Sequence, residues 1–125
     1  MKPIYLLDTV ILIDHLNGIP KATKWLKSVE IEKLAISVIT RAEVLTGTSK
    51  SEYAAVNLML DRFKCFHIDS NIANETAKLR KENRWKLPDA FQAAIAIQHS
   101  LKLVTRNTKD FTQEKYPFVI IPYNL

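Results

Sequence analysis

The sequence predicts an α/β fold in which helices cover both faces of a central, mainly parallel sheet of four to five strands. Short apolar segments alternate along the chain with longer segments whose apolar residues have helical spacing. Several short segments, such as "LAISV" and "FVIIP", are almost wholly apolar, which is typical of strands buried on both faces. With 125 residues, 47% hydrophobic and 25% charged, the chain is expected to form one domain, 1–125, around a single core.

Five segments are expected to form the strands. The first, "PIYLLD", is short and apolar and ends at Asp8, and "LAISV" is a second buried strand. "CFHI" is a brief strand, while "KLVT" and "FVIIP" form the last two and flank the loop "RNTKDF". The expected strands span residues 3–8, 34–38, 65–68, 102–105 and 118–122.

Six segments are expected to form helices. "TVILIDHLNG" stops at Gly18, and Pro20 stands near the first turn of "PKATKWLKSV". The helix of "TRAEVLTG" starts near Ile39 or Thr40, and Ser51 is the expected N-cap of the helix after it. The expected helices span residues 9–18, 20–29, 40–47, 51–63, 70–83 and 88–100.

The composition favours an anionic partner. Eighteen Lys and Arg residues against thirteen Asp and Glu residues give a formal net charge of +5. Such a surface attracts polyanions, above all nucleic acid. Many basic proteins bind no nucleic acid. The net charge therefore indicates a nucleic-acid partner only if acidic residues are concentrated at one place within the basic surface.

The single cysteine and the N-terminal segment exclude several classes. Cys65 allows neither an intramolecular disulfide nor a zinc site built from thiolates, and it is expected to be a small buried hydrophobe. The segment "MKPIYLLDTVILID" resembles a signal peptide, but Asp8 and Asp14 interrupt its apolar run. No segment is apolar for long enough to span a membrane. A soluble, cytoplasmic protein is expected.

Acidic residues follow the expected strands at several places. Asp8 closes the first strand, and Glu43 lies about one turn into the helix after the second. Asp89 opens the helix before "KLVT", and Asn107 and Asp110 lie in the loop after it. Ligands of parallel α/β sheets bind outside the carboxyl ends of the strands. These residues are therefore expected to meet at one edge of the sheet.

Each of these acids also has an ordinary structural explanation. Asp8 could cap the helix that follows it, and Glu43 could be a solvated helix residue. Asp89 could interact only with the helix dipole, and Asp110 could be an ordinary loop residue. Taken singly, these explanations are the better ones. Taken together, the four acids indicate a shared site.

A cluster of carboxylates in a partly buried cleft indicates a bound cation. Unpaired anions repel one another, and burying them is costly. Ligands that offer only oxygen point to Mg²⁺ or Mn²⁺. His15, His67 and His99 share no helical spacing with the acids, so zinc is not predicted.

The helix faces add support. Thr40, Glu43 and Gly47 fall on one side of their helix, and Gly47 is expected to permit a close approach. Asp89 and Gln92 are three residues apart and fall on the same side of their helix. The one polar residue within the apolar stretch of this helix is therefore expected on the same face as the aspartate. Gln92 either supports the site or is a hydrogen-bonded core amide.

Three stretches of the chain resemble a known family. "LLDTVILID", "ISVITRAEVLTG" and "LPDAFQAAIAIQHSLKLVTRNTKDF" resemble the signature blocks of PIN-domain ribonucleases, specifically of VapC-type toxins from bacterial toxin–antitoxin pairs. The blocks stand in the family's order and the resemblance covers essentially the whole chain. It implies a PIN-like, three-layer α/β/α fold.

The resemblance also implies the residues of a metal site. Asp8, Glu43 and Asp89 match the family's three metal-binding acids. The family's more variable fourth acid falls at Asn107, where this chain has an amide, with Asp110 close by. An amide oxygen can still bind a metal directly or through water, so the departure leaves the number of metal ions open.

The implied activity is metal-dependent cleavage of single-stranded or loop RNA. A Mg²⁺ or Mn²⁺ ion held by these acids would activate a water for in-line attack on phosphorus. Thr9 and Thr105 match positions where the family often has hydroxyls near the site, and they are given minor positioning roles. The basic residues expected to hold the RNA backbone are Arg41, Arg84, Lys86, Arg106 and Lys109.

The resemblance further implies protein partners. Toxins of this family typically form homodimers and are silenced by a cognate VapB-type antitoxin that packs across the site. The apolar surface around Trp25 and Leu26 could receive such a partner, although Trp25 could equally belong to the core.

Two other functions are compatible with parts of the pattern. A phosphotransfer protein of the receiver or haloacid-dehalogenase kind also has strand-end aspartates and Mg²⁺. Val10 occupies the position where the dehalogenase pattern needs a second carboxylate, and "LLDT" lacks the acidic pair of a receiver. A PIN-like module that binds RNA or protein without nuclease activity stays open because of Asn107.

Overall fold

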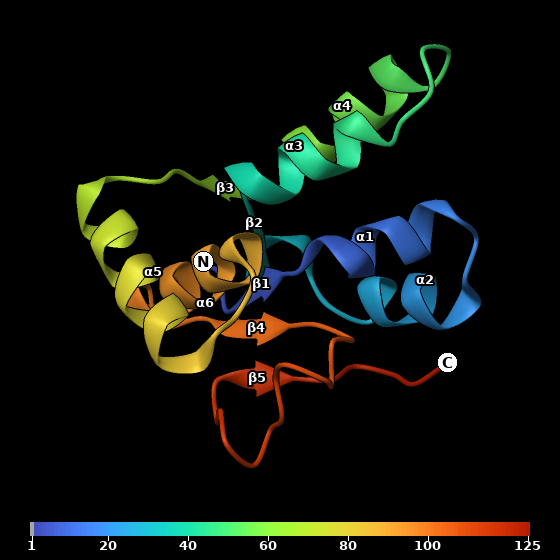
Figure 1. Ribbon diagram of the computed structural model, residues 1–125. Helices are drawn as coiled ribbons and strands as arrows, with labels where there is room; N and C mark the ends of the chain where they lie inside the picture. The colour runs from blue at the N-terminus through green and yellow to red at the C-terminus, as the bar shows by residue number, and fades with distance from the viewer. Residues whose placement is uncertain (1) are drawn as a thin grey trace.

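Five parallel strands form one sheet in the computed structural model, which describes residues 2–125. The strand order is β3-β2-β1-β4-β5, and each neighbouring pair is parallel (Figure 1). The strands are β1 (Tyr5–Leu7), β2 (Leu34–Ser37), β3 (Lys64–Phe66), β4 (Lys102–Val104) and β5 (Val119–Ile120). The predicted parallel sheet is therefore confirmed.

Helices connect the first four strands and lie on both faces of the sheet, while β4 and β5 are joined by a loop alone. The helices are α1 (Thr9–Leu16), α2 (Pro20–Lys27), α3 (Val38–Thr46), α4 (Tyr53–Asp61), α5 (Ser70–Asn83) and α6 (Leu87–Gln98). A short 3-10 turn, η1 (Ile31–Lys33), precedes β2. Figure 1 shows α5 and α6 side by side, with α3 and α4 forming a hairpin that extends away from the sheet. The three-layer α/β/α arrangement is the expected one.

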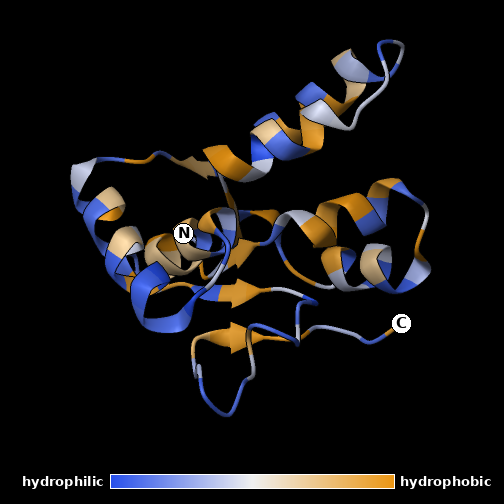
Figure 2. Ribbon diagram, viewed as in Figure 1, coloured by the Kyte–Doolittle hydropathy of each residue, from blue (hydrophilic) through white to orange (hydrophobic). Residues whose placement is uncertain are grey.

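The central strands are mostly apolar because both of their faces are buried. Successive side chains of a strand point to opposite faces, so each strand contributes to two cores. The strands of this structure are hydrophobic along most of their length (Figure 2). One face carries Leu6, Ala35 and Leu103, and the other carries Leu7, Ile36 and Val104.

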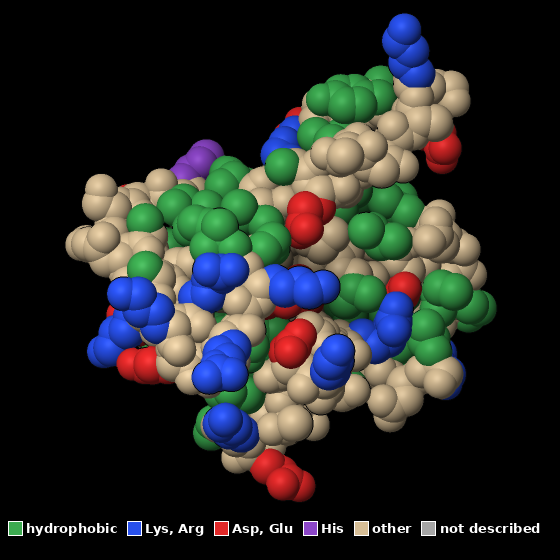
Figure 3. Space-filling view, in the orientation of Figure 1, with side chains coloured by type: hydrophobic (Ala, Val, Ile, Leu, Met, Phe, Trp, Pro, Cys, Tyr) green, Lys and Arg blue, Asp and Glu red, His purple; other side chains and the backbone are tan. Residues whose placement is uncertain are grey.

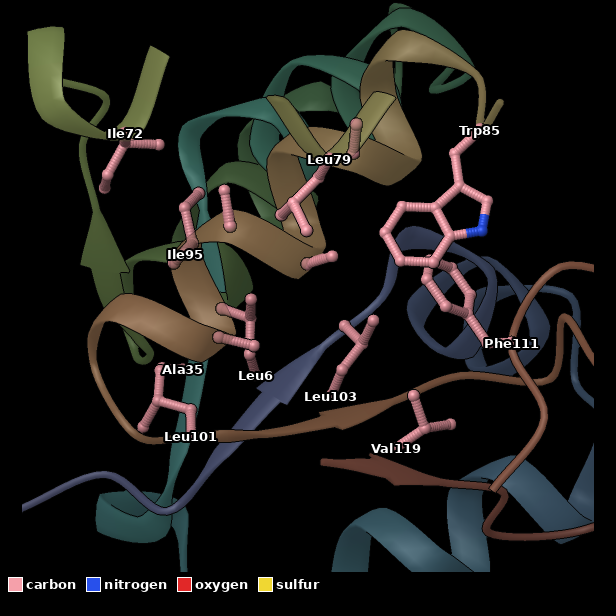
Figure 4. Packing of buried hydrophobic residues seen from close by; sticks show 14 residues of the cluster. Leu6, Ala35, Ile72, Leu79, Trp85, Ile95, Leu101, Leu103, Phe111 and Val119 are labelled. Atoms are coloured by element: carbon pink, nitrogen blue, oxygen red, sulfur yellow. The ribbon is translucent and has the colours of Figure 1, made fainter. Parts of the chain in front are cut away.

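The first core lies between the sheet and the pair α5 and α6. Small alanines such as Ala93 and Ala94 are fully buried and let α6 approach its neighbours closely. At one end of this core the rings of Trp85 and Phe111 are 4.8 Å apart, and Trp85 also meets Tyr116 at 5.0 Å (Figure 4). These aromatic contacts fix the segment before α6 against the loop after β4.

The second core lies on the opposite face of the sheet. It joins Ile11 of α1, Val44 of α3 and Leu60 of α4 with the strand residues of that face. Trp25 of α2 is partly buried against this core and meets Tyr5 edge-on at 5.7 Å. Much of the Trp25 side chain therefore packs in the core, as one of the two interpretations of this residue expected.

Polar residues at the end of three strands, or directly after it, lie buried at one edge of the sheet. The Asp8 amide donates to the Val104 carbonyl at 2.9 Å, which ties the end of β1 to the end of β4. Ser37 ends β2, and its hydroxyl accepts from the Thr40 amide at 3.2 Å as the N-cap of α3. Thr105 follows β4 and is fully buried. This edge of the sheet therefore gathers polar side chains from distant parts of the sequence.

Every predicted strand and helix is present, and most differences lie at element ends. The last strand was expected at 118–122 and is reduced to Val119–Ile120. The turn η1 was not predicted. No helix among residues 2–125 combines the length and the apolar character needed to cross a membrane.

Three local predictions are wrong. Ser51 is not the N-cap of α4, because the helix begins at Tyr53 after Glu52, which already has helical backbone angles. Cys65 is only partly buried, since β3 is an edge strand of the sheet. Gly47 permits no close approach, because a Cβ atom there would meet nothing nearer than 3.8 Å.

Candidate functional site

A cleft of about 760 Å³ opens where the carboxyl ends of β1 and β4 meet the first turns of α1 and α6. The three acids predicted from the sequence, Asp8, Glu43 and Asp89, all line it. In Figure 3, Lys and Arg side chains gather around acidic side chains near the centre of the face that is shown. The fold thus brings three acids from three separate segments to one cleft within a basic surface.

Asp8 is buried at the base of this cleft, with 8% of its surface exposed. It caps α1, and its carboxylate accepts from the Thr9 amide at 2.9 Å. The Thr105 hydroxyl donates to its other oxygen at 2.7 Å, and the Gln92 amide approaches at 3.4 Å. Burial raises the pKa of Asp8 despite these hydrogen bonds, which lower it. Asp8 is therefore both a helix cap and a cleft residue.

A chain of hydrogen bonds leads from Gln92 to Glu43. The Gln92 amide donates to the Thr40 hydroxyl at 2.6 Å, and the Thr40 and Thr9 hydroxyls are 3.0 Å apart. The Thr9 hydroxyl donates to Oε1 of Glu43 at 2.6 Å. Because that bond uses the Thr9 proton, Thr40 is the donor to Thr9. This series of hydrogen bonds holds Glu43, an exposed residue of α3, in place from the buried side of the helix.

Gln92 is fully buried, and all its bonds lie within this network. Its carbonyl oxygen accepts from the Ser37 hydroxyl at 2.8 Å, and its amide group reaches Thr40 and Asp8. The two readings of Gln92 are thus compatible: it is a hydrogen-bonded core amide that also contacts Asp8.

Asp89 lies in the first turn of α6, partly buried. Burial raises the pKa of Asp89 to about 6, and the charges of Asp8, Asp110 and Glu43 contribute, while Lys86 opposes them. Residues 2–125 provide no hydrogen bond to its carboxylate. Among the described residues, the ionised form of Asp89 thus receives no hydrogen bond and only the nearby charge of Lys86 favours it.

Asn107 and Asp110 bond to each other. The Asn107 side-chain amide donates to the Asp110 carboxylate at 3.0 Å, and the Asp110 backbone amide donates to Oδ1 of Asn107 at 3.2 Å. Asn107 lines the cleft, whereas Asp110 is not among the lining residues. The Asn107 backbone amide also donates to the Thr105 hydroxyl at 3.1 Å. The loop after β4 is thereby fixed beside Asp8.

The five basic residues expected to hold RNA have separate locations. Arg106 and Lys109 line the cleft, and Lys86 lies close enough to Asp89 to lower its pKa. Arg41 is outside the lining and pairs with Asp61 of α4 at 2.8 Å. Arg84 lines a second cavity.

One network at the cleft was not predicted. Asp14 of α1 is buried and accepts two bonds from Arg106, at 2.8 and 3.0 Å, and one from the Tyr123 hydroxyl at 2.7 Å. The hydrogen bond from Arg106 lowers the pKa of Asp14. The signal in the sequence was an acid inside the apolar run "TVILID", but nothing local identified Arg106 and Tyr123 as its partners.

The donor set of the cleft fits a hard divalent cation. It offers carboxylate and amide oxygens, the ligands of Mg²⁺ and Mn²⁺, while no His or Cys lines it among the described residues. A cation would also relieve the repulsion that raises the pKa of Asp89. Within residues 2–125 no three His, Cys, Asp or Glu side chains form a ready-made metal cage. Water and substrate oxygens would therefore complete the coordination, as is usual for Mg²⁺.

Comparisons with known proteins agree with this architecture. The family model of the PIN domain matches residues 5–116. Ribonuclease VapC10 of Mycobacterium tuberculosis is 34% identical over 124 residues, covering 92% of this chain and 93% of the relative. Ribonuclease VapC19 of the same organism is 30% identical over 125 residues, covering 94% and 98%.

Solved structures show the same fold. A toxin–antitoxin complex from Klebsiella pneumoniae contains a chain of 38% identity with a TM-score of 0.89, covering 97% of this chain and 99% of that one. FitAcB from Neisseria gonorrhoeae matches with 26% identity and a TM-score of 0.79, covering 98% and 100%. The domain match and the relatives that align over nearly the whole chain show that the chain belongs to the PIN-domain family, among the VapC-type proteins.

Proposed function

We propose that this chain is a metal-dependent endoribonuclease and the toxin of a type II toxin–antitoxin pair, acting as a single PIN-like domain over residues 1–125. One observation carries the proposal: Asp8, Glu43 and Asp89 come from separate segments and line one cleft within a basic surface. The ribonuclease names of its relatives support the choice of RNA as the substrate.

The three acids are the proposed ligands of a Mg²⁺ or Mn²⁺ ion. Bound there, the ion would supply Lewis-acid activation of a water and charge stabilisation at the leaving 3′ oxygen. Asp8 would be held in position by the hydroxyl of Thr105 and the amide of Thr9. Asn107 and Asp110 are weaker candidate ligands, because their side chains are engaged with each other.

Glu43 is suited to orient the attacking water. Oε1 of Glu43 accepts a hydrogen bond from the Thr9 hydroxyl, which fixes the carboxylate. The second oxygen, Oε2, accepts no hydrogen bond from residues 2–125. That oxygen would accept a hydrogen bond from water aligned for in-line attack on phosphorus. Cleavage would leave a 5′-phosphate and a 3′-hydroxyl.

The basic rim would hold the RNA backbone. Arg106 and Lys109 line the cleft, and Lys86 lies beside Asp89, so these three are the proposed phosphate contacts nearest the reaction. Arg41 is a weaker candidate because it lies outside the residues that line the cleft.

A VapB-type antitoxin and a second copy of the chain are the proposed protein partners. The related chain from Klebsiella pneumoniae was solved in a toxin–antitoxin complex, which supports an antitoxin partner here. An enzyme acting on cellular RNA in this way would work in the cytoplasm.

A cleavage assay tests the activity. End-labelled RNA is incubated with the purified protein in Mg²⁺, in Mn²⁺ and in excess EDTA, and the product ends are identified by their reactivity toward ligase. We expect cleavage only with the metals and product ends that carry a 5′-phosphate. RNA that is bound but never cut under any of these conditions would contradict the nuclease and favour a PIN-like binding module.

The metal should stabilise the protein in a pH-dependent manner. Protons compete with the metal for Asp89, whose pKa of about 6 lies above its ordinary value. In thermal melts we therefore expect Mg²⁺ to raise the melting temperature at pH 7.5, and the increase to shrink as the pH falls through 6. An Mg²⁺ effect that is the same at pH 5 and pH 7.5 would argue against binding at Asp89.

A further inference from the structure

A second cavity, of about 450 Å³, lies beside the N-terminus of α6. Its lining includes the cations Arg80 and Lys81 near the end of α5 and Arg84 just after it. Figure 3 shows Lys and Arg side chains gathered over the end of α5 and the start of α6.

These cations have no counter-charge in the cavity. No acid lines it among the described residues, and the two ion pairs found within residues 2–125 involve Arg41 and Arg106 instead. At about 100° per residue, Glu75 and Glu82 fall on the side of α5 away from Arg80 and Lys81. Three like charges so close together favour an anionic ligand.

The backbone at the end of α5 brings Arg84 to the cavity. Arg84 caps α5 with φ 59° and ψ 28°, in the left-handed region where helices usually place glycine or asparagine. The conformation places Arg84 on the cavity with the other two cations.

The cavity also offers apolar surface next to its charges. Leu87 lines it with 49% of its surface exposed, while Trp85 at its wall is buried. Trp85 is held in place by a hydrogen bond from its indole nitrogen to the Asp110 carbonyl at 3.2 Å. Cations beside an exposed apolar side chain can bind single-stranded nucleic acid, with the cations contacting a phosphate and Leu87 contacting the face of a base.

The cavity borders the catalytic cleft through one turn of helix. Leu87 lines the cavity, while the next two residues, Pro88 and Asp89, line the cleft. The cavity and the cleft therefore adjoin each other at the first turn of α6. Asp110 provides a second link between the cavity and the cleft. Its backbone carbonyl accepts a hydrogen bond from Trp85 of the cavity, and its carboxylate accepts one from Asn107 of the cleft.

We propose that the cavity of Arg80, Lys81 and Arg84 is a second RNA subsite, which binds a backbone phosphate and an adjoining base next to the nucleotides at the cleft. This inference rests on the ribonuclease function proposed above. The subsite would determine how the RNA lies across Asp89. It would also strengthen the binding of RNA substrates that are long enough to reach the subsite.

The test compares two double neutralisations. R80Q/K81Q removes two cavity charges, and K24Q/K27Q removes two exposed charges from α2 as a matched control. For a single-stranded RNA of about ten nucleotides, we expect R80Q/K81Q to raise KM about tenfold with little change in kcat. A dinucleotide, which has only the phosphate at the cleft, should be cleaved equally by both variants and the unmodified protein.

Binding in EDTA gives a readout that does not need cleavage. Fluorescence anisotropy with the same RNA at several salt concentrations should show a log–log salt slope smaller by about 0.7 in R80Q/K81Q, since each phosphate contact to a single strand contributes about 0.7 and the subsite holds one phosphate. R84N should also weaken binding while keeping its fold, because asparagine tolerates the left-handed backbone.

The outcomes separate the two proposals. If the unmodified protein cleaves but R80Q/K81Q and K24Q/K27Q have equal KM values and equal salt slopes, the second subsite is wrong and the nuclease stands. If no protein cleaves but R80Q/K81Q alone loses RNA affinity, the nuclease is wrong and the cavity still binds RNA. Equal loss on the dinucleotide and the longer RNA would also contradict a separate subsite.

Discussion

Replacing Asp8 with asparagine should abolish RNA cleavage and stabilise the metal-free protein. Even residues that only support metal ligands typically change activity or affinity 10- to 100-fold, so loss of a proposed ligand should reduce kcat/KM by more than about a hundredfold. Asparagine can keep one of the hydrogen bonds and reverse the other, because its Oδ1 can accept from Thr9 while its amide donates to the Thr105 hydroxyl, which donates to Asp8 in the unmodified protein.

The gain in stability follows from the raised pKa of Asp8. Burial makes the ionised form unfavourable in the folded protein, so Asp8 contributes stability at low pH and loses it as the pH rises through its folded pKa. The melting temperature of D8N should therefore exceed that of the unmodified protein at pH 7.5 in EDTA, and the difference should disappear near pH 3.

An exposed aspartate provides the control for this substitution. Asp61 lies on α4 outside the cleft, so D61N makes the same chemical change and should leave cleavage intact. Cleavage by D8N at the rate of D61N would remove Asp8 from the proposed mechanism. A lower melting temperature for D8N in EDTA would show that its carboxylate stabilises the fold, against the expectation from burial.

Replacing Arg106 with methionine should be strongly destabilising. The substitution leaves the buried Asp14 with Tyr123 as its one remaining partner in this network. Breaking a buried ion pair costs about 3 to 5 kcal/mol, and because the Arg106 side chain is 31% exposed we expect about 2 to 3 kcal/mol. Urea unfolding of R106M and the unmodified protein at pH 7 measures the loss.

The pH dependence identifies the cause of that loss. Arg106 lowers the pKa of Asp14, so the pair contributes stability above the unfolded pKa of Asp14 and loses it as the pH falls through the lower folded pKa. The difference between R106M and the unmodified protein should therefore shrink in acid. The double variant D14L/R106M should recover part of the loss, since it leaves no unpaired charge. A constant difference from pH 7 to pH 3, or no recovery, would point to lost packing instead.

The fold could be predicted because its strands are buried on both faces. Residues such as Leu6 and Leu7 are adjacent yet belong to different cores, which produces the continuous apolar runs visible in the sequence. The positions of Asp8 and Asp89 followed from the same logic, since each stands at the boundary between a strand or loop and a helix. Local rules and the parallel topology were sufficient there.

The remaining features depend on contacts between distant residues. Asp14 pairs with Arg106 and Tyr123, which lie more than 90 positions away, and no local pattern encodes such a pair. The mutual bonding of Asn107 and Asp110 depends on the shape of their loop, which hydrophobic periodicity does not specify. Ser51 failed as a cap because the turn before α4 already places Glu52 in a helical conformation.

The location of the metal tests the central claim most directly. Crystals soaked in Mn²⁺ and measured at the manganese absorption edge would give an anomalous difference map that locates the ion without reference to activity. We predict a peak between the carboxylates of Asp8 and Asp89, within reach of Glu43 directly or through water, and its loss in D8N crystals. A map with no peak in this cleft, or with its manganese bound elsewhere on the protein, would contradict the account.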